Sequence, residues 1–292
     1  MRVTERTRMG MMLLAQNRAS SRLDEASRIA SGAQRVSKPS DDPTAYGSMI
    51  RKNYTLALLE QHSQIATRAQ GELEIAQNSL SESIDLISRA RESAIAGANT
   101  TADARTRQLL GDEIRTIRNS LMALANTRYS NKYLFGGTKT DAAPFDPTTG
   151  TFVGNDQTVR VPVLEGVAPA ANISGAQAFT SAGGRDVFAD LENLAQALYN
   201  NDAAGIQAAI APLEAGHQQI VRAQVDAGFG ADRFKMAVEM IDSTRAALAE
   251  QLHQEIEGDP AAQITEFTLA RTAYERSVAV TKQLLSIATQ GG

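Results

Sequence analysis

The fold is decided by residues 44–96, which read TAYGSMIRKNYTLALLEQHSQIATRAQGELEIAQNSLSESIDLISRARESAIA. This stretch contains no proline, and its apolar residues recur at alternating spacings of three and four, the period of one helix face. Asp42 is a suitable N-cap, and Pro43 suits the first helical position. A helix of about 53 residues would span about 80 Å, whereas a compact chain of this length is about 50 Å across. The stretch therefore predicts an elongated helical rod.

The helical period continues on both sides of the middle of the chain. Gly258 suits the position just after a helix, and Asp259 suits the N-cap of the next one. The spacing of apolar residues predicts further helices at these places: 102–128, 185–199, a helix that begins near Asp202, a separate helix over 231–257, and a last helix from Pro260.

Residues 130–184 differ from the rest because glycines and prolines cluster there. Two short β-type runs, 151–153 and 158–164, are separated by turn residues and predict a hairpin. The predicted fold class is mainly α: an elongated antiparallel helical rod or coiled-coil bundle, formed by the N- and C-terminal helices, with a small β-containing insert in the middle. The predicted division is an N-terminal assembly helix and turn (1–43), N-terminal rod helices (44–129), the insert (130–184), C-terminal rod helices (185–258) and a C-terminal assembly helix (259–292).

The composition excludes several classes of protein. The 29 basic and 33 acidic residues give a formal net charge of -4, so no basic excess indicates nucleic-acid binding. The chain has no cysteine, which excludes disulfides, thiolate metal sites and cysteine nucleophiles. The apolar run at residues 9–15 is too short for a cleaved signal peptide, and no run approaches the roughly 18 apolar residues of a membrane span. Composition alone would place the chain in the cytosol.

No motif predicts an enzyme. The paired carboxylates Asp41 and Asp42 fit a turn that starts a helix better than acid–base catalysis. Residues 136–139, Gly-Gly-Thr-Lys, lack the spacing of a phosphate-binding loop. The histidines lie on different predicted helices and lack a metal-binding spacing: His62, His217 and His253. We therefore expect no catalytic residue, no cofactor and no metal ligand.

The terminal segments carry more apolar surface than one intramolecular contact needs. Two apolar seams run in parallel along the C-terminal segment, and small and apolar residues recur with the same rhythm near the N-terminus. From the residues alone two interpretations stay open: the ends close one intramolecular bundle, or they become ordered against neighbouring copies. In the second case the expected assembly interface comprises Met9, Leu13, Gln16, Leu23, Ile264, Phe267, Arg271, Tyr274, Val278, Leu284, Leu285 and Ile287.

Two motifs and both chain ends carry a resemblance to a known family. The first motif is the turn Pro39, Ser40, Asp41, Asp42 and Pro43, which follows the first helical segment. The second motif opens the insert and contains Tyr133, Leu134, Phe135, Gly136, Pro144 and Phe145. Together with residues 1–4 and the final segment 264–285, they resemble the flagellin superfamily, closest to its flagellar hook-associated protein 3 branch of hook–filament junction proteins.

The resemblance implies a structural component of the bacterial flagellum. Members of this branch link the first junction protein to the flagellin filament by helical self-assembly of their terminal helices, and the insert faces outward. The implied partners are copies of the chain itself, a hook-associated protein 1 type junction protein, flagellin, a flagellar export chaperone and the export apparatus, with no nucleic acid and no membrane insertion. The implied location is extracellular, on the flagellum, reached by type III export without a cleaved signal peptide.

Three alternatives remain at this stage. A short flagellin, which forms the filament itself, would share the motifs of the superfamily. A cytosolic helical-bundle enzyme or carrier would need a ligand pocket and ordered termini. A coiled-coil binding module would dimerise through the seam between Leu56 and Ala94.

Overall fold

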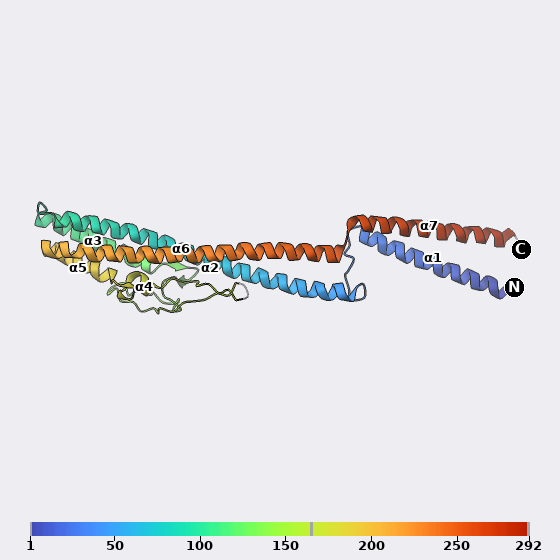
Figure 1. Ribbon diagram of the computed structural model, residues 1–292, viewed down its shortest axis with the longest axis horizontal. Helices are drawn as coiled ribbons and strands as arrows, with labels where there is room; N and C mark the ends of the chain where they lie inside the picture. Colours follow the sequence, from blue (N-terminus) through green and yellow to red (C-terminus); the bar gives the residue numbers. More distant parts are fainter. Residues whose placement is uncertain (1, 164–165, 291–292) are drawn as a thin grey trace. The chain divides into compact units, whose positions relative to one another are not determined.

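The computed structural model describes residues 2–163 and 166–290, with the side chains of residues 2–6, 8 and 284–290 left out. Helix accounts for 73% of the chain, beside a small two-stranded antiparallel sheet, which confirms the predicted mainly α fold with a small β-containing insert. Figure 1 shows these elements along the chain. In order they are α1 (Arg2–Ala30), α2 (Pro43–Ala98), α3 (Ala104–Ala125), β1 (Arg128–Tyr129), β2 (Lys132–Tyr133), α4 (Gly175–Phe179), the 3-10 helix η1 (Ser181–Gly183), α5 (Val187–Tyr199), α6 (Ala203–Glu257) and α7 (Pro260–Gln290).

The chain forms two compact units. The terminal unit comprises residues 1–59 and 243–292, and the middle unit comprises residues 60–242. The division into five segments that the sequence predicts is finer than this, and it stays a prediction. Among the described helices, none combines the length and the apolar character that crossing a membrane requires.

Helix α2 begins where the sequence predicts. The Oδ1 atom of Asp42 accepts hydrogen bonds from the backbone N–H groups of Thr44 and Ala45, at 3.1 and 3.0 Å. Pro43 is the first residue of the helix, where its missing N–H leaves no hydrogen bond unmade. This start is therefore fixed by local side-chain chemistry.

Helix α6 is continuous from Ala203 to Glu257, so the prediction of two helices meeting near residue 231 is wrong. Two glycines just before residue 231 allow close packing within the helix. A Cβ at Gly230 would lie 2.9 Å from Cδ1 of Leu73, and one at Gly228 would lie 3.3 Å from Nε2 of Gln77. Both partners lie on α2, so these glycines permit the close approach of α6 to α2 without ending the helix.

The end of α6 and the start of α7 match the prediction. Gly258 adopts a φ of 77°, the left-handed conformation that commonly terminates a helix. The Asp259 Oδ1 atom then accepts the N–H of Ala261 at 2.9 Å, and α7 begins at Pro260.

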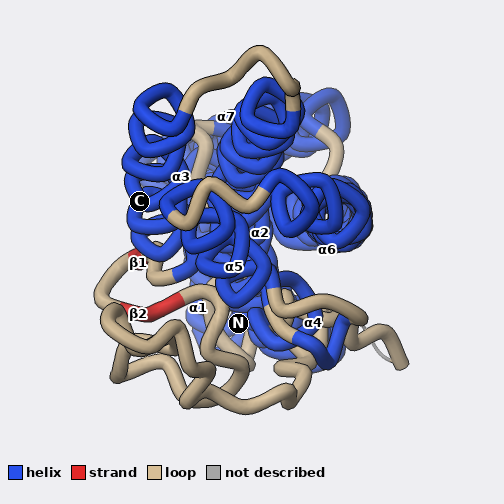
Figure 2. The backbone as a smooth tube through the Cα atoms, turned by 90° about the vertical axis from the view of Figure 1, so that its left-hand side faces the viewer, coloured by secondary structure: helices blue, strands red, loops and turns tan. Residues whose placement is uncertain are grey.

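The insert contains a different sheet from the predicted hairpin. Strands β1 and β2 pair antiparallel, with Arg128 opposite Tyr133, and they are the red part of a segment that Figure 2 shows mostly as loop. Of the predicted runs 151–153 and 158–164, residue 164 lies outside the described residues, and the described parts of the two runs do not pair with each other. Instead Phe152 forms an isolated antiparallel β-bridge with Phe145, and Arg160 forms one with Ala170.

Local hydrogen bonds explain this different pairing. The Oδ1 atom of Asp146 accepts the N–H groups of Thr148 and Thr149 at 2.9 and 2.8 Å, which closes a turn between Phe145 and Phe152. The chain therefore reverses before residue 151, and the first β-type run is paired with the segment that precedes it.

The middle unit holds the main core. Helices α2 and α6 run antiparallel there. Ser63 of α2 donates to Asp242 of α6 at 3.4 Å, and Arg91, later on α2, forms an ion pair with Glu214, which is earlier on α6. Helices α3 and α5 lie beside them (Figure 1). The largest fully buried side chains of this core come from α2, α3, α5 and the insert, and α6 adds Ile206, Leu213 and Ile220. The largest are Leu80, Ile87, Ile114, Leu121, Phe135, Phe145, Phe179, Phe188, Leu191 and Leu194.

Candidate assembly interface

Helices α1 and α7 form a pair with a very small buried core. They lie side by side in Figure 1, and an ion pair of 2.7 Å joins Arg22 of α1 to Glu266 of α7. Among the described side chains of these two helices, only Ala26 and Ala270 are buried. An alanine methyl stabilises a fold by about 0.8 kcal/mol when buried, so this contact alone gives the two long helices little stability.

The predicted interface residues of α1 share one face of the helix, but only the later part of that face is covered. Gln16 and Leu23 are half-buried, on the same side as the buried Ala26, and this part is covered by α7. Met9 and Leu13 are exposed, with 42% and 52% of their surfaces accessible. One part of the predicted set therefore contacts the chain's own α7, and the other part is open.

The predicted residues of α7 divide in the same way. Phe267, Tyr274 and Val278 are half-buried, whereas Ile264 is 62% exposed. Arg271 is also exposed and forms an ion pair of 2.9 Å with Glu275. The remaining predicted residues lie where the structure describes no side chains: Leu284, Leu285 and Ile287.

The terminal helices expose further apolar residues that the predicted interface does not contain. Met11 and Leu14 of α1 are 63% and 58% exposed, and Leu269 and Val280 of α7 are 58% and 50% exposed. Exposed large apolar residues that gather into patches are typical of protein interaction sites. Their exposure became visible only with the α1–α7 contact, because the sequence period alone does not say which side α7 covers.

The turn at residues 39–43 is a capping structure. The Oδ2 atom of Asp41 accepts the backbone N–H groups of Ser37 and Lys38, at 3.1 and 3.2 Å. These hydrogen bonds, chiefly the one from Ser37, hold the pKa of Asp41 below its ordinary value. The N–H of Ala45 does the same for the pKa of Asp42. Each carboxylate is thus occupied by the backbone.

The segment before this turn is held against the end of α6. The N–H groups of Arg35 and Val36 donate to the carbonyl of Ile256 at 2.9 and 3.3 Å, and Val36 is fully buried. The Arg35 guanidinium lies 3.5 Å from the Asp42 carboxylate. Sequence reasoning missed this contact, because residues about 220 positions apart show no local signal for it.

A second contact joins α2 to α6 inside the terminal unit. The Oε2 atom of Glu255 accepts from Lys52 at 2.7 Å and from Ser48 at 2.9 Å. The hydrogen bond from Lys52 is the main cause that lowers the pKa of Glu255. The start of α2 and the end of α6 are therefore tied together by a charged pair.

The motif that opens the insert forms the core of that insert. Leu134, Phe135, Gly136, Pro144 and Phe145 are buried, and Tyr133 is half-buried. The ring of Phe135 meets Phe179 edge-on at 5.6 Å between centroids. Phe145 contacts three rings at 5.1–5.7 Å: Phe152, Phe179 and Phe188. This motif therefore has a packing role, and its signal in the sequence is the recurrence of phenylalanine in a chain poor in aromatic residues.

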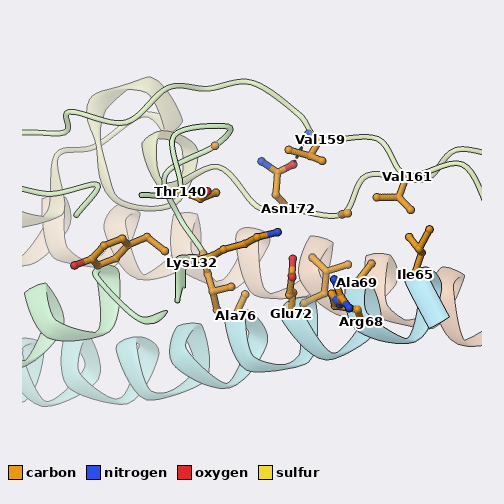
Figure 3. Close-up of a pocket in the computed structure, with 15 residues that line it drawn as sticks. Ile65, Arg68, Ala69, Glu72, Ala76, Lys132, Thr140, Val159, Val161 and Asn172 are labelled. Atoms are coloured by element: carbon orange, nitrogen blue, oxygen red, sulfur yellow. Dashed lines mark hydrogen bonds between the residues drawn. The ribbon is translucent and has the colours of Figure 1, made fainter. Parts of the chain in front are cut away.

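A shallow cavity of about 210 Å³ lies between α2 and the insert, in the middle unit. Figure 3 shows Ile65, Ala69 and Ala76 of α2 on one side and Val159 and Val161 on the other. Arg68, Glu72 and Lys132 are the charged residues around it. Its walls are largely apolar, which fits a packing seam.

The structure brings no histidines together with carboxylates as a metal centre would require. His253 lies 3.2 Å from Glu257 on the same helix, and the Nδ1 atom of His62 is buried without a hydrogen-bond partner. Within the described residues, no group of three or more His, Cys, Asp or Glu side chains could hold a metal ion.

Comparison with known proteins identifies the first half of the chain. Residues 4–140 match the family model described as the bacterial flagellin N-terminal helical region. The flagellar hook-associated protein 3 of Salmonella typhimurium (strain LT2) is 33% identical over 152 residues, which is 52% of this chain and 48% of that protein. The chain thus matches about half the length of this curated relative. The resemblance drawn from the two motifs is confirmed.

Solved structures agree on the fold. FlgL of Bacillus cereus superposes with a TM-score of 0.61 at 20% identity, over 70% of this chain and 99% of that one. A flagellar hook associated protein-3 from Legionella pneumophila superposes with a TM-score of 0.60 at 15% identity, over 72% and 98%. At these identities the likeness establishes the shared fold and nothing further.

Proposed function

We propose that this chain, which carries the bacterial flagellin N-terminal helical region, is a structural component of the bacterial flagellum at the hook–filament junction. It acts there as an adaptor between a hook-associated protein 1 type junction protein and the flagellin filament. The observation that carries the proposal is the 33% identity, over 152 residues, to a flagellar hook-associated protein 3. The proposed role is that of a structural protein and not of an enzyme.

The physical basis of the proposal is folding coupled to assembly. The α1–α7 pair buries only two alanines among its described side chains, while Met11, Leu14 and Leu269 are largely exposed. Ordering such helices costs about 1–2 kcal/mol per residue in backbone entropy. Burial of the exposed apolar residues against neighbouring copies would offset that cost, so the terminal helices gain their full stability in the assembly.

The proposed interface combines the exposed and half-buried members of the predicted set. Met9, Leu13 and Ile264 would contact neighbours directly, and Leu284, Leu285 and Ile287 complete the predicted set. Gln16, Arg271 and Thr281 interrupt the apolar rhythm and would fix the register between copies, as buried polar positions do in coiled coils. The double variant Arg271→Leu with Thr281→Leu should then preserve assembly while relaxing the choice of partner.

The proposed partners and location follow from the same role. The chain would contact copies of itself, flagellin and the first junction protein, after delivery by a flagellar export chaperone and the export apparatus. It would reach the outside of the cell through the type III pathway without losing a signal peptide. The insert at residues 130–184 would face outward, away from the contacts between terminal helices.

Deletion of residues 263–292 tests the proposal. In a strain that lacks its own copy of the gene, we expect the shortened chain to be secreted while filaments are lost or detach and motility disappears. The matched point variants are Leu269→Asp, which places a charge on α7, and Leu109→Asp, which alters an equally exposed leucine of α3. Only the first should prevent incorporation into the flagellum. Normal, attached filaments with the deletion would contradict the proposal.

A short flagellin is the second candidate, because the matching family model describes flagellin. The number of copies per flagellum separates the two. A junction protein is present in a small, fixed number at the filament base, whereas a flagellin is present in proportion to filament length. Quantitative mass spectrometry of flagella sheared to different lengths measures this directly.

A further inference from the structure

The terminal unit contains an apolar notch of about 230 Å³ where α1, the following turn and the start of α7 meet. Its apolar lining comes from the buried Ala26 and half-buried Ile29 of α1 and from the exposed Ala262 of α7. A cavity of about 150 Å³ already holds a benzene molecule, so this notch has room for one leucine or methionine side chain. It is therefore shaped to receive a single apolar side chain.

Charged groups surround the notch. Its rim contains the carboxylates of Glu257, Asp259 and Glu266 and one guanidinium, that of Arg35. Arg22 pairs with Glu266 at 2.7 Å, so two guanidinium groups face the three acidic groups and the rim carries a small net negative charge. A partner segment with an apolar side chain and neighbouring basic residues would complement it.

The first half of α1 has this chemistry. Leu14 is 58% exposed and Met11, one turn before it, is 63% exposed, and both lie on the side opposite the half-buried Gln16. Arg18 is exposed one turn after Leu14, on the same side. Residues 2–18 contain four arginines and one glutamate, so this part of α1 is strongly basic.

Leu14 cannot enter the notch of its own chain. It lies on the same continuous helix as Ile29, which forms part of the lining. Fifteen residues separate them, which corresponds to about 22 Å along a helix. A Leu14 side chain could therefore reach the notch only from another molecule.

We infer that Leu14 of a second copy of this chain docks in the notch at Ala26, Ile29 and Ala262, with Arg18 of that copy against the acidic rim. The inference rests on the proposed self-assembly and specifies one of its contacts. Leu14 and the notch lie at different places on the chain. Each copy therefore inserts its own Leu14 into one neighbour and receives the Leu14 of another neighbour in its notch. Such a head-to-tail contact repeats without closing on a pair and generates a ring or a helical array.

Engineered cysteines test the contact cleanly, because the chain has no cysteine of its own. The variant Leu14→Cys with Ala262→Cys should form disulfides between copies, since a disulfide needs Cα atoms within about 7 Å and the two positions in one chain are too far apart. Met11→Cys with Ala262→Cys is the second variant, because it keeps Leu14 intact. The control is Leu14→Cys with Ala204→Cys, which uses an exposed residue at the start of α6.

Flagella purified from cells that carry each variant are oxidised and separated on non-reducing gels. We expect a ladder of dimers, trimers and longer species for at least one notch variant and none for the control. Arg18→Glu, added to the notch variant, should lower the ladder yield several-fold, and a further Glu257→Arg should restore it. Flagella that incorporate the notch variants without any ladder overturn this inference and leave the proposed function intact. A chain that is absent from flagella contradicts the proposed function, and the inference falls with it.

Discussion

The side chain of Gln219 binds both backbone polar groups of Arg185: its Oε1 accepts the Arg185 N–H at 2.8 Å, and its Nε2 donates to the Arg185 carbonyl at 3.0 Å. The same Nε2 lies within 3.2 Å of the carbonyls of Ala178 and Thr180. Gln219 lies on α6 and is only 3% exposed. One side chain thus fixes the path of the segment that connects α4 to α5.

Gln219→Ala should destabilise the middle unit. Removal of the amide leaves buried backbone groups without partners, and each such group costs about 1–3 kcal/mol. The free energy of unfolding, measured by urea titration with circular dichroism, should fall by at least that amount. Gln218→Ala is the control, because Gln218 is exposed and donates only to Glu214 on its own helix. Equal stability of the two variants would contradict the role given to Gln219.

Phe145→Ala should be more damaging still. The ring is fully buried and contacts three other rings, so its loss leaves a cavity that costs about 3–5 kcal/mol. Phe229→Ala removes a ring that is 60% exposed and should change stability by no more than about 0.5 kcal/mol. Thermal and urea unfolding of both variants measures the difference. A cost below 1 kcal/mol at Phe145 would show that the ring cluster does not support the fold.

Gly136→Ala should disturb the opening of the insert. A Cβ there would lie 2.2 Å from the carbonyl oxygen of Lys139, a contact that forces the backbone to move. Crowding of this kind costs about 1–3 kcal/mol. Gly10→Ala is the matched control, because its Cβ would meet nothing within 4 Å and α1 should gain up to about 1 kcal/mol in helix stability. Limited proteolysis should cut the insert faster in the first variant only.

The turn at residues 39–43 should weaken in acid. The folded chain holds the pKa of Asp41 and Asp42 below the ordinary value of 3.8, so both carboxylates contribute stability above that pH. This contribution should be lost as the pH falls through the lowered values, when protonation removes the acceptors of the backbone N–H groups. NMR titration of the two carboxyl carbons should give midpoints below 3.8, and the amide shifts of Ser37 and Ala45 should follow the same midpoints.

Asp42→Asn is the control for this titration. Asparagine also caps helices but does not titrate, so the amide of Ala45 should then stay unchanged across the acid range. Midpoints at or above the ordinary aspartate value would contradict the hydrogen-bonding role of the turn.

The helix ends were predictable because they depend on neighbouring residues. Asp42 and Pro43 start α2, and Gly258 and Pro260 separate α6 from α7, through contacts within a few positions of the chain. The continuity of α6 was not predictable in this way. Gly230 resembles a helix breaker in isolation, and only the approach of Leu73 from α2 explains its presence.

The candidate site was predictable in part. The sequence indicated that the terminal helices are apolar on more than one side, and the structure leaves Met9, Leu13 and Ile264 exposed. The spacing of apolar residues does not show which side of each terminal helix is covered by the other. The exposed Leu14 and Leu269 were therefore not predicted as interface residues. The contact of Arg35 with the Ile256 carbonyl was also not predicted. It is a backbone hydrogen bond between distant segments, and most residue types could make it.

The insert and α5 share one cluster of phenylalanine rings, and this limits which foreign segments could replace the insert. Phe145 comes from a loop yet packs on Phe188 of α5 and Phe179 of α4, and Phe152 of the loops packs on Phe145 in the same continuous group. Loops and helices of the middle unit should accordingly melt in one cooperative step. A foreign peptide grafted in place of these loops would remove part of the helices' own interior, so only a graft that retains the rings will leave a foldable scaffold.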